Sequence, residues 1–189
     1  MTTAAAPTPP PVYPEDLERT WIAPDGTAVL LRALRPDDLD RELRFIAGLS
    51  SRTLYQRVQY SASAVSRSDA ARLLDLDYRD RMAIGALTGP GSDPLIVGVS
   101  RYARDPGQDT AECAIVVTDD WQGRGLGTQL MRSLAVAARR QGIRWLVGSS
   151  LADNSRIHDW ARRFGLEVRT QPDSGGQVVI TVDLQSIPA

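Results

Sequence analysis

One acidic residue lies inside a stretch of the chain that is otherwise apolar. Glu112 falls in the segment Ala111–Thr118, which reads as a β-strand. Alternation along a strand places it on the same face as Ala114 and Val116. A carboxylate in this setting can take a proton from a reacting group, as a general base does, and partial burial would favour its protonated form. A solvated or salt-bridged acid at a strand edge is the alternative interpretation.

A glycine-rich turn follows this segment directly. It reads Gln122-Gly123-Arg124-Gly125-Leu126-Gly127-Thr128 and leads into a helical pattern. Glycines at alternate positions let backbone N–H groups approach an external anion. The start of the next helix adds unpaired N–H groups and the positive end of a dipole. Such a turn suits a pyrophosphate.

Two nucleotide-binding motifs resemble this turn without matching it. A Walker loop requires a lysine, and all 22 basic residues of this chain are arginine. The Rossmann fingerprint requires a third glycine where Thr128 stands, and an acid about 20 residues further on that is missing from the segment 143–148. An ordinary glycine-rich loop that enters a helix is the remaining alternative at this point.

The elements that hold these residues follow from the spacing of apolar residues and from turn signals. They predict an α+β fold of one domain with three layers, in which three consecutive strands form an antiparallel meander. Ser68 is the predicted N-cap of the third helix. The expected strands are 27–35, 82–88, 94–102, 111–118, 143–148, 166–170 and 177–184, and the expected helices are 36–48, 51–60, 68–76, 125–141 and one capped by Asn154.

The turn carries a resemblance to a known family. Gln122 to Gly127 matches Q/R-x-x-G-x-G/A, the acetyl-CoA motif of the GNAT-type N-acetyltransferases. The order of elements from Thr27 to Leu184 also resembles that fold, and residues 154–166 (NSRIHDWARRFGL) are similar to the family's second signature. The resemblance implies a central, mostly antiparallel sheet of about seven strands flanked by helices, with acetyl-CoA as co-substrate.

The resemblance also implies a set of binding residues. In GNAT enzymes the strand before the turn holds the pantetheine arm of acetyl-CoA, in a gap beside the next strand, and the turn holds the pyrophosphate. The arm is thereby assigned to Ile115, Val116 and Val117, and its distal part to Asn154. The pyrophosphate is assigned to Gln122, Gly123, Arg124, Gly125, Leu126, Gly127 and Thr128, with Arg124 able to meet phosphate directly.

Within the superfamily the chain most resembles the acetyltransferase domain of bacterial protein-lysine acetyltransferases, in segments 21–26, 31–38, 48–57 and 111–117. Those enzymes place their catalytic glutamate in the same Ala-Glu context, which implies that Glu112 is the base and that a protein lysine is the first acceptor to expect. Many GNAT enzymes use a tyrosine as general acid, but its position here is Ala161. Other candidate acids are Tyr55, Tyr60, Tyr78 and Tyr102. A small-molecule amine acetyltransferase and a non-catalytic acyl-CoA sensor are the alternative functions.

Composition excludes several other classes. The formal net charge of −1 shows no basic excess for nucleic acid or an anionic membrane. With a single cysteine (Cys113, predicted to be a buried apolar residue) and a single histidine (His158, predicted to lie on the polar side of its helix), no metal site is expected. Residues 1–15 read as a disordered tail rather than a secretory signal, and residues 16–189 as one cytoplasmic domain without a membrane span. The oligomeric state stays open.

Overall fold

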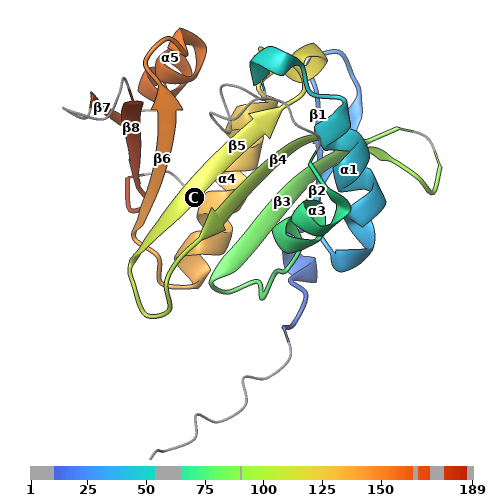
Figure 1. Ribbon diagram of the computed structural model, residues 1–189, viewed down its shortest axis with the longest axis horizontal. Coiled ribbons are helices and arrows are strands. Elements are labelled where there is room, and N and C mark those ends of the chain that lie inside the picture. Colours follow the sequence, from blue (N-terminus) through green and yellow to red (C-terminus); the bar gives the residue numbers. More distant parts are fainter. Residues whose placement is uncertain (1–10, 54–64, 90, 164–165, 171–176, 187–189) are drawn as a thin grey trace, which may run out of the picture.

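The computed structural model describes residues 11–53, 65–89, 91–163, 166–170 and 177–186. Its centre is a twisted sheet in the order β1-β2-β3-β4-β5-β6-β8-β7 (Figure 1). All neighbouring strands run antiparallel except β5 and β6, which run parallel. The strands are β1 (Arg19–Ile22), β2 (Ala28–Ala33), β3 (Arg81–Thr88), β4 (Leu95–Ala103), β5 (Thr110–Val117), β6 (Trp145–Leu151), β7 (Glu167–Thr170) and β8 (Gln177–Asp183). The mixed, mostly antiparallel fold is therefore confirmed.

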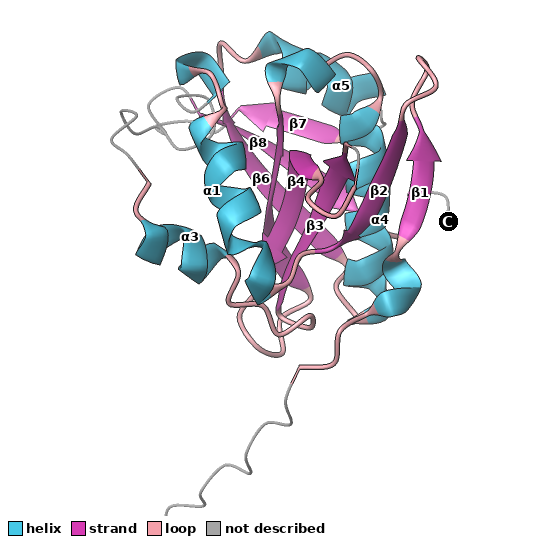
Figure 2. Cartoon of the chain, turned by 90° about the vertical axis from the view of Figure 1, so that its right-hand side faces the viewer, coloured by secondary structure: helices cyan, strands magenta, loops and turns pink. Residues whose placement is uncertain are grey.

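Helices cover both faces of this sheet. Helix α4 lies behind it, and α1 and α3 lie in front (Figures 1 and 2). The helices are α1 (Leu39–Ala47), α3 (Arg67–Leu73), α4 (Leu126–Arg140) and α5 (Ser155–Arg163), with 3₁₀ turns η1 (Glu15–Leu17), η2 (Pro36–Asp38) and η3 (Asp119–Trp121). Two apolar clusters result, one under α4 around Leu130 and Leu134 and one under α1 around Phe45 and Leu74. Helix α4 packs so closely that a Cβ on Gly98 would lie 2.9 Å from Cδ1 of Leu130.

The sheet has one strand more than the sequence predicted. Strand β1 pairs with β2 in a hairpin, with Trp21 opposite Val29, whereas the sequence suggested only a turn-rich start here. The turn is limited to the few residues around Gly26, which has a φ of +85°. A strand of four residues (Arg19–Ile22) at the edge of a sheet gives almost no periodicity, so pattern reasoning missed it.

Two further boundaries differ from prediction. Helix α3 is capped by Ser66, not Ser68: the Ser66 hydroxyl accepts a hydrogen bond from the Asp69 N–H at 3.1 Å, and the Asp69 carboxylate accepts one from the Ser66 N–H. In the predicted disordered tail, residues 1–10 lie outside the described residues, but Tyr13 is packed edge-on against Tyr78 with ring centroids 5.6 Å apart. Most of the helix predicted over 51–60 also lies outside the described residues.

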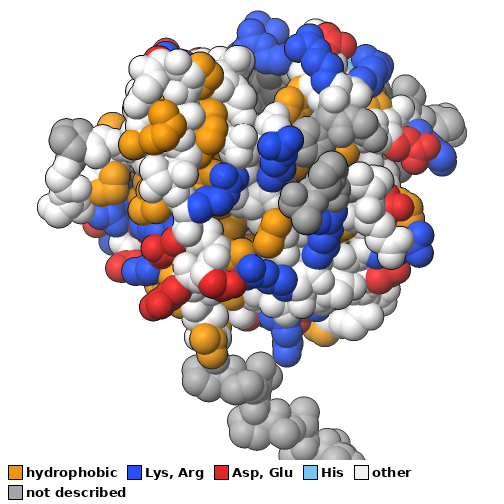
Figure 3. Space-filling view, turned by 180° about the vertical axis from the view of Figure 1, so that it is seen from behind, with side chains coloured by type: hydrophobic (Ala, Val, Ile, Leu, Met, Phe, Trp, Pro, Cys, Tyr) orange, Lys and Arg blue, Asp and Glu red, His pale blue; other side chains and the backbone are white. Residues whose placement is uncertain are grey.

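The surface carries many arginines without one dominant patch in view. Seen from behind, they are spread over the whole face, and several lie beside acids (Figure 3). No helix in the described part of the chain is long and apolar enough to cross a membrane. Among the same residues, no group of three or more His, Cys, Asp or Glu side chains could hold a metal ion.

Candidate active site

The glycine-rich turn joins β5, through η3, to the start of α4. Gly123 and Gly125 have φ of +78° and +90°, a left-handed backbone that side chains rarely adopt, and Gly125 caps α4. A Cβ on Gly123 would meet nothing within 4 Å, so backbone conformation rather than space requires glycine there. The first hydrogen bonds of α4 run from Thr128 and Gln129 to the Gly125 carbonyl, at 3.1 and 3.3 Å. The N–H groups just before Thr128 are therefore available to an anion.

Gln122 is tied into the protein at both ends of its side chain. Its Nε2 donates to the Val117 carbonyl and to Oδ1 of Asp119, both at 3.0 Å, and its Oε1 accepts a hydrogen bond from Arg156 at the start of α5. Asp119 also accepts a hydrogen bond from the Thr53 hydroxyl at 2.8 Å. Hydrogen bonds from Ser50 and Thr53 hydroxyls lower the pKa of Asp119. Gln122 thus fixes the shape of the turn, and Asp119 links the turn to Thr53.

Arg124 is already paired in this structure. Its guanidinium donates to Asp25 at 2.7 Å, in the turn between β1 and β2, and lies 5.0 Å from the centre of the Trp121 ring. Both partners of the ion pair are about half exposed, so the pair is weak and can exchange for a stronger anion. Direct contact of Arg124 with phosphate remains a prediction.

The side chains that follow the turn point into the protein. Leu126 is fully buried under α4. The Thr128 hydroxyl accepts a hydrogen bond from Nε1 of Trp160 at 3.0 Å, and a Cβ on Gly127 would lie 3.7 Å from Cδ1 of Ile115. At Leu126 and Gly127 any contact with an anion must therefore come from the backbone, whereas Thr128 still has its hydroxyl hydrogen to donate. Asn154 caps α5, its Oδ1 accepting a hydrogen bond from the Ile157 N–H at 3.4 Å.

Strands β5 and β6 separate where the sequence places the reacting groups. They pair only from Thr110 opposite Trp145 to Glu112 opposite Val147, and they diverge beyond that point (Figure 1). The edge of β5 that faces this gap includes the predicted arm-binding residues Ile115, Val116 and Val117. Gly148 stands at the vertex, where a Cβ would come within 3.3 Å of the Cys113 carbonyl oxygen.

A cavity of about 320 Å³ opens at this vertex. Glu112 lies in its wall and is exposed, not partly buried as the sequence suggested. It has no hydrogen bond or ion pair with any described residue, so the salt-bridged interpretation is not supported. Arg101 lies in the same wall, but its guanidinium donates to the buried Glu42 carboxylate on α1 and to the Leu73 carbonyl at 3.2 Å. The cavity lining is Arg101, Tyr102, Ala103, Glu112, Cys113, Ala114, Val147, Gly148, Ser149 and Val179.

The three described tyrosines all donate to acceptors within the protein. Tyr13 donates to the Glu18 carboxylate at 2.6 Å, with the Ala33 carbonyl at 3.1 Å as a second acceptor, and Tyr78 and Tyr102 donate to the carbonyls of Leu34 and Arg79, each at 3.1 Å. Burial raises the pKa of each, that of Tyr13 to about 12 with help from its hydrogen bond to Glu18. Tyr78 and Tyr102 are therefore poor proton donors, and Ala161 is fully buried. The other candidate acids, Tyr55 and Tyr60, lie outside the described residues.

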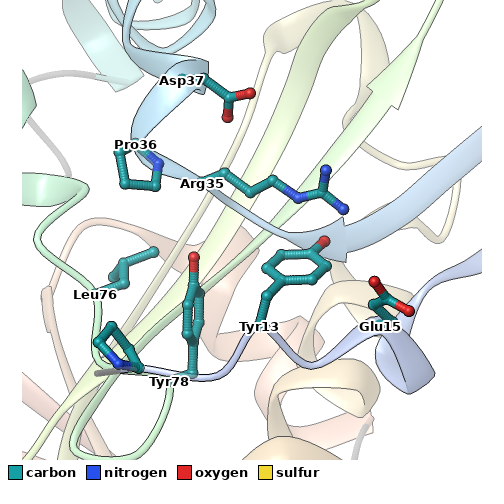
Figure 4. A pocket seen from close by; sticks show the side chains of 8 residues that line it. Tyr13, Glu15, Arg35, Pro36, Asp37, Leu76 and Tyr78 are labelled. Carbon is teal, nitrogen blue, oxygen red and sulfur yellow. The ribbon is translucent and has the colours of Figure 1, made fainter. Parts of the chain in front are cut away.

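Tyr13 and Tyr78 belong to a second cavity of about 560 Å³, near η1 and η2 (Figure 4). Their rings stand next to each other, and the Arg35 guanidinium lies 3.9 Å above the centre of the Tyr13 ring. Of the residues predicted for the site, only the candidate acid Tyr78 lines this cavity, and Glu112 and the predicted acetyl-CoA-binding residues do not. The acetyl-transfer chemistry is therefore expected at the smaller cavity beside Glu112.

The structure contradicts the prediction for the single histidine and partly supports the prediction for the single cysteine. His158 is buried, with 6% of its surface exposed, so its predicted place on the polar side of α5 is wrong. Burial, which disfavours the charged imidazolium, lowers its pKa. Cys113 is half-buried and packs on the α4 side of the sheet, which supports the apolar role in part.

Comparison with known proteins agrees with the fold. Residues 50–166 match the model of the acetyltransferase (GNAT) family. The chain belongs to the GNAT family. It is 37% identical over 155 residues to Acetyltransferase PA5475 of Pseudomonas aeruginosa, covering 82% of this chain and 83% of that protein. It is 36% identical over 141 residues to Acetyltransferase Pat of Mycolicibacterium smegmatis, covering 74% of this chain but 41% of that protein.

A solved structure shows the same fold. The GNAT domain of S. lividans PAT superposes with a TM-score of 0.82 at 25% identity, over 91% of this chain and 99% of that one. The GNAT assignment makes the chain an acetyl-CoA-dependent N-acetyltransferase, and enzymes of this family bind acetyl-CoA and an acceptor.

Sequence reasoning missed three features of the site. Gly148 and Ser149 line the vertex from β6, and Asp25 reaches the turn from the β1–β2 hairpin. The signal for the first two was present in the run Gly148-Ser149-Ser150, where polar residues interrupt an apolar strand. No signal pointed to Asp25, because its pairing with Arg124 spans 99 positions.

Proposed function

We propose that this protein transfers the acetyl group of acetyl-CoA to the side-chain amine of a protein lysine, with Glu112 as general base. The observation that carries the proposal is the position of Glu112, exposed and without an ion-pair partner among the described residues, where β5 and β6 separate. A base must reach the amine that it deprotonates. A carboxylate that is exposed at the vertex of the gap meets that requirement.

The remaining predicted residues fit the shape of acetyl-CoA. The N–H groups of Leu126 and Gly127 at the start of α4, with the positive end of that helix, suit the pyrophosphate. The backbone of β5 from Ile115 to Val117 is unpaired on its β6 side and suits the amides of the pantetheine arm. A side chain at Gly148 would narrow the gap at its vertex.

A general base is needed because a lysine amine is almost entirely protonated at neutral pH. At pH 7.4 about one lysine in a thousand is neutral, which costs roughly 4 kcal/mol before attack can begin. Glu112 takes the proton as the nitrogen attacks the thioester carbonyl and passes it to solvent, which its exposure allows. Arg101 does not neutralise Glu112, since its described partners are Glu42 and Leu73.

A protein lysine is preferred as acceptor because of the resemblance to bacterial protein-lysine acetyltransferases. The cavity fits this choice, because Glu112 is the one acid among its lining residues and a small cationic amine would gain little charge recognition there. The chain also has no lysine, so it cannot acetylate its own side chains on that residue.

The test is acetyl-CoA turnover with a panel of lysine-rich proteins, lysine peptides and small amines, followed by release of the CoA thiol. Acceptor-dependent release with proteins, and acetyl-lysine identified by mass spectrometry, is the expected result. Because the enzyme contributes no acetyl-lysine, every modified lysine belongs to the acceptor. Release with small amines alone would favour a small-molecule acetyltransferase. Tight acetyl-CoA binding without turnover on any acceptor would favour a sensor.

A further inference from the structure

Acetyl transfer from a thioester leaves a thiolate, and none of the tyrosines in the described ranges has a hydroxyl free to stabilise it. The family's tyrosine position is Ala161, which is fully buried, and the described tyrosines all donate to acceptors within the protein. Some other donor must face the sulfur if the leaving group is assisted by the described part of the protein.

Ser149 has a hydroxyl at the vertex of the β5–β6 gap. It lies on β6, is exposed and lines the cavity at the vertex together with Glu112. Because Val147 is directly opposite Glu112 in the parallel pair, Ser149, two residues further along β6, faces the same side of the sheet as Glu112. Two residues correspond to about 7 Å along a strand, which leaves room for a thioester and an attacking amine between the two side chains.

The hydroxyl of Ser150, the next residue along β6, already has a partner within the protein. Ser150 is buried and its hydroxyl donates to the Leu151 carbonyl at 3.2 Å. The Ser149 hydroxyl is exposed and has no hydrogen-bond partner among the described residues. Its donor is free for a bound molecule.

We propose that Ser149 is a catalytic residue whose hydroxyl donates a hydrogen bond to the sulfur of the thioester as the thiolate leaves. This inference rests on the proposed acetyl-CoA site. The amine lone pair forms the C–N bond, the C–S bond breaks with its electron pair on sulfur, and Glu112 takes the proton from nitrogen. Ser149 keeps its own proton and stabilises the charge on sulfur, and the thiolate then takes a proton from water. A hydroxyl is too weak an acid to give its proton away, but a hydrogen bond to a charged atom strengthens as charge develops.

The first test compares Ser149→Ala with Ser150→Ala, two identical changes at adjacent positions on opposite faces of β6. Ser149→Ala is expected to lower kcat by about 10-fold, the usual effect of one hydrogen bond to a charged group, with KM for acetyl-CoA unchanged. Ser150→Ala is expected to keep kcat within about twofold of wild type. Ser149→Thr, which retains the hydroxyl, is expected to recover most of the activity. A Ser149→Ala enzyme as fast as wild type overturns the proposal.

The second test does not depend on turnover. The thiol of bound CoA is titrated by the ultraviolet absorbance of its thiolate, in the binary complexes of wild type, Ser149→Ala and Ser150→Ala. The thiol is expected to ionise at a pH about one unit lower in wild type and Ser150→Ala than in Ser149→Ala, as a 10-fold stabilisation of the thiolate requires. Equal ionisation in all three overturns the proposal even if Ser149→Ala is slow. A wild-type enzyme that binds CoA but acetylates nothing refutes the proposed function and still leaves this comparison decisive for Ser149.

Discussion

Replacing Glu112 by Gln is expected to slow acetylation without disturbing the fold. Glu112 is exposed and has no described hydrogen bond or ion pair, so the amide removes no interaction of the folded protein. General bases contribute about 10²- to 10⁴-fold, and the enzyme must offset a neutral-amine penalty of roughly 4 kcal/mol. Glu112→Gln should therefore reduce kcat at least about 100-fold at pH 7.4, while Kd for acetyl-CoA stays the same.

The pH dependence makes the test specific. Without the base, the reaction uses only amine that is already neutral, so the rate of Glu112→Gln should rise about tenfold per pH unit until the acceptor pKa near 10.4 is approached. The deficit relative to wild type should shrink accordingly. The assay is CoA thiol release at saturating acetyl-CoA from pH 6.5 to 9.5, with thermal unfolding as a check on folding.

Glu167→Gln is the matched control. Glu167 is also a strand acid, on β7, with Arg169 as its described partner at 2.7 Å, and strand β8 separates β7 from the β5–β6 gap. It should turn over like wild type. A Glu112→Gln enzyme within about threefold of wild type at pH 7.4, or with a deficit that stays constant up to pH 9.5, would refute the base assignment.

Three other outcomes are expected. A side chain at the Gly125 φ of +90° costs about 1–2 kcal/mol, so in Gly125→Ala the free turn should relax to another conformation that binding must reverse. Kd for acetyl-CoA should then rise about 5- to 30-fold. Gly107→Ala, with a similar φ of +84° in the β4–β5 turn, should leave Kd unchanged in titration calorimetry. Since burial lowers the pKa of His158 below its ordinary value near 6.5, stability should be complete above that pH and fall as pH decreases through it. His158→Gln should remove that decrease in urea midpoints between pH 7.5 and 5, and an identical pH dependence in both proteins would contradict the burial argument. Glu42→Ala should lower the free energy of unfolding by about 3 kcal/mol, because it leaves the Arg101 charge largely buried without its carboxylate. A loss below about 1 kcal/mol in denaturant unfolding would show that this ion pair does not stabilise the fold.

Local sequence was sufficient to predict the glycine-rich turn and the helix that follows it. The helix start after Gly125, the need for glycine at Gly123 and the acid at Glu112 all depend on residues within a few positions of one another. Helix and strand periodicity are likewise local, which is why the meander β3–β4–β5 and helix α4 were predicted correctly. The same spacing identified the family.

Tertiary structure decided which of these groups meet and how exposed they are. The vertex beside Glu112 exists because β6, more than 30 residues later in the chain, pairs with β5 over three residues and then diverges. The face that Ser149 presents is set by the register of β6, and a shift of one residue would exchange it with Ser150. The burial of His158 and the pairing of Arg124 with Asp25 depend in the same way on distant elements. Short-range spacing determines which face of an element a residue occupies, but only the packing of remote elements decides what covers that face.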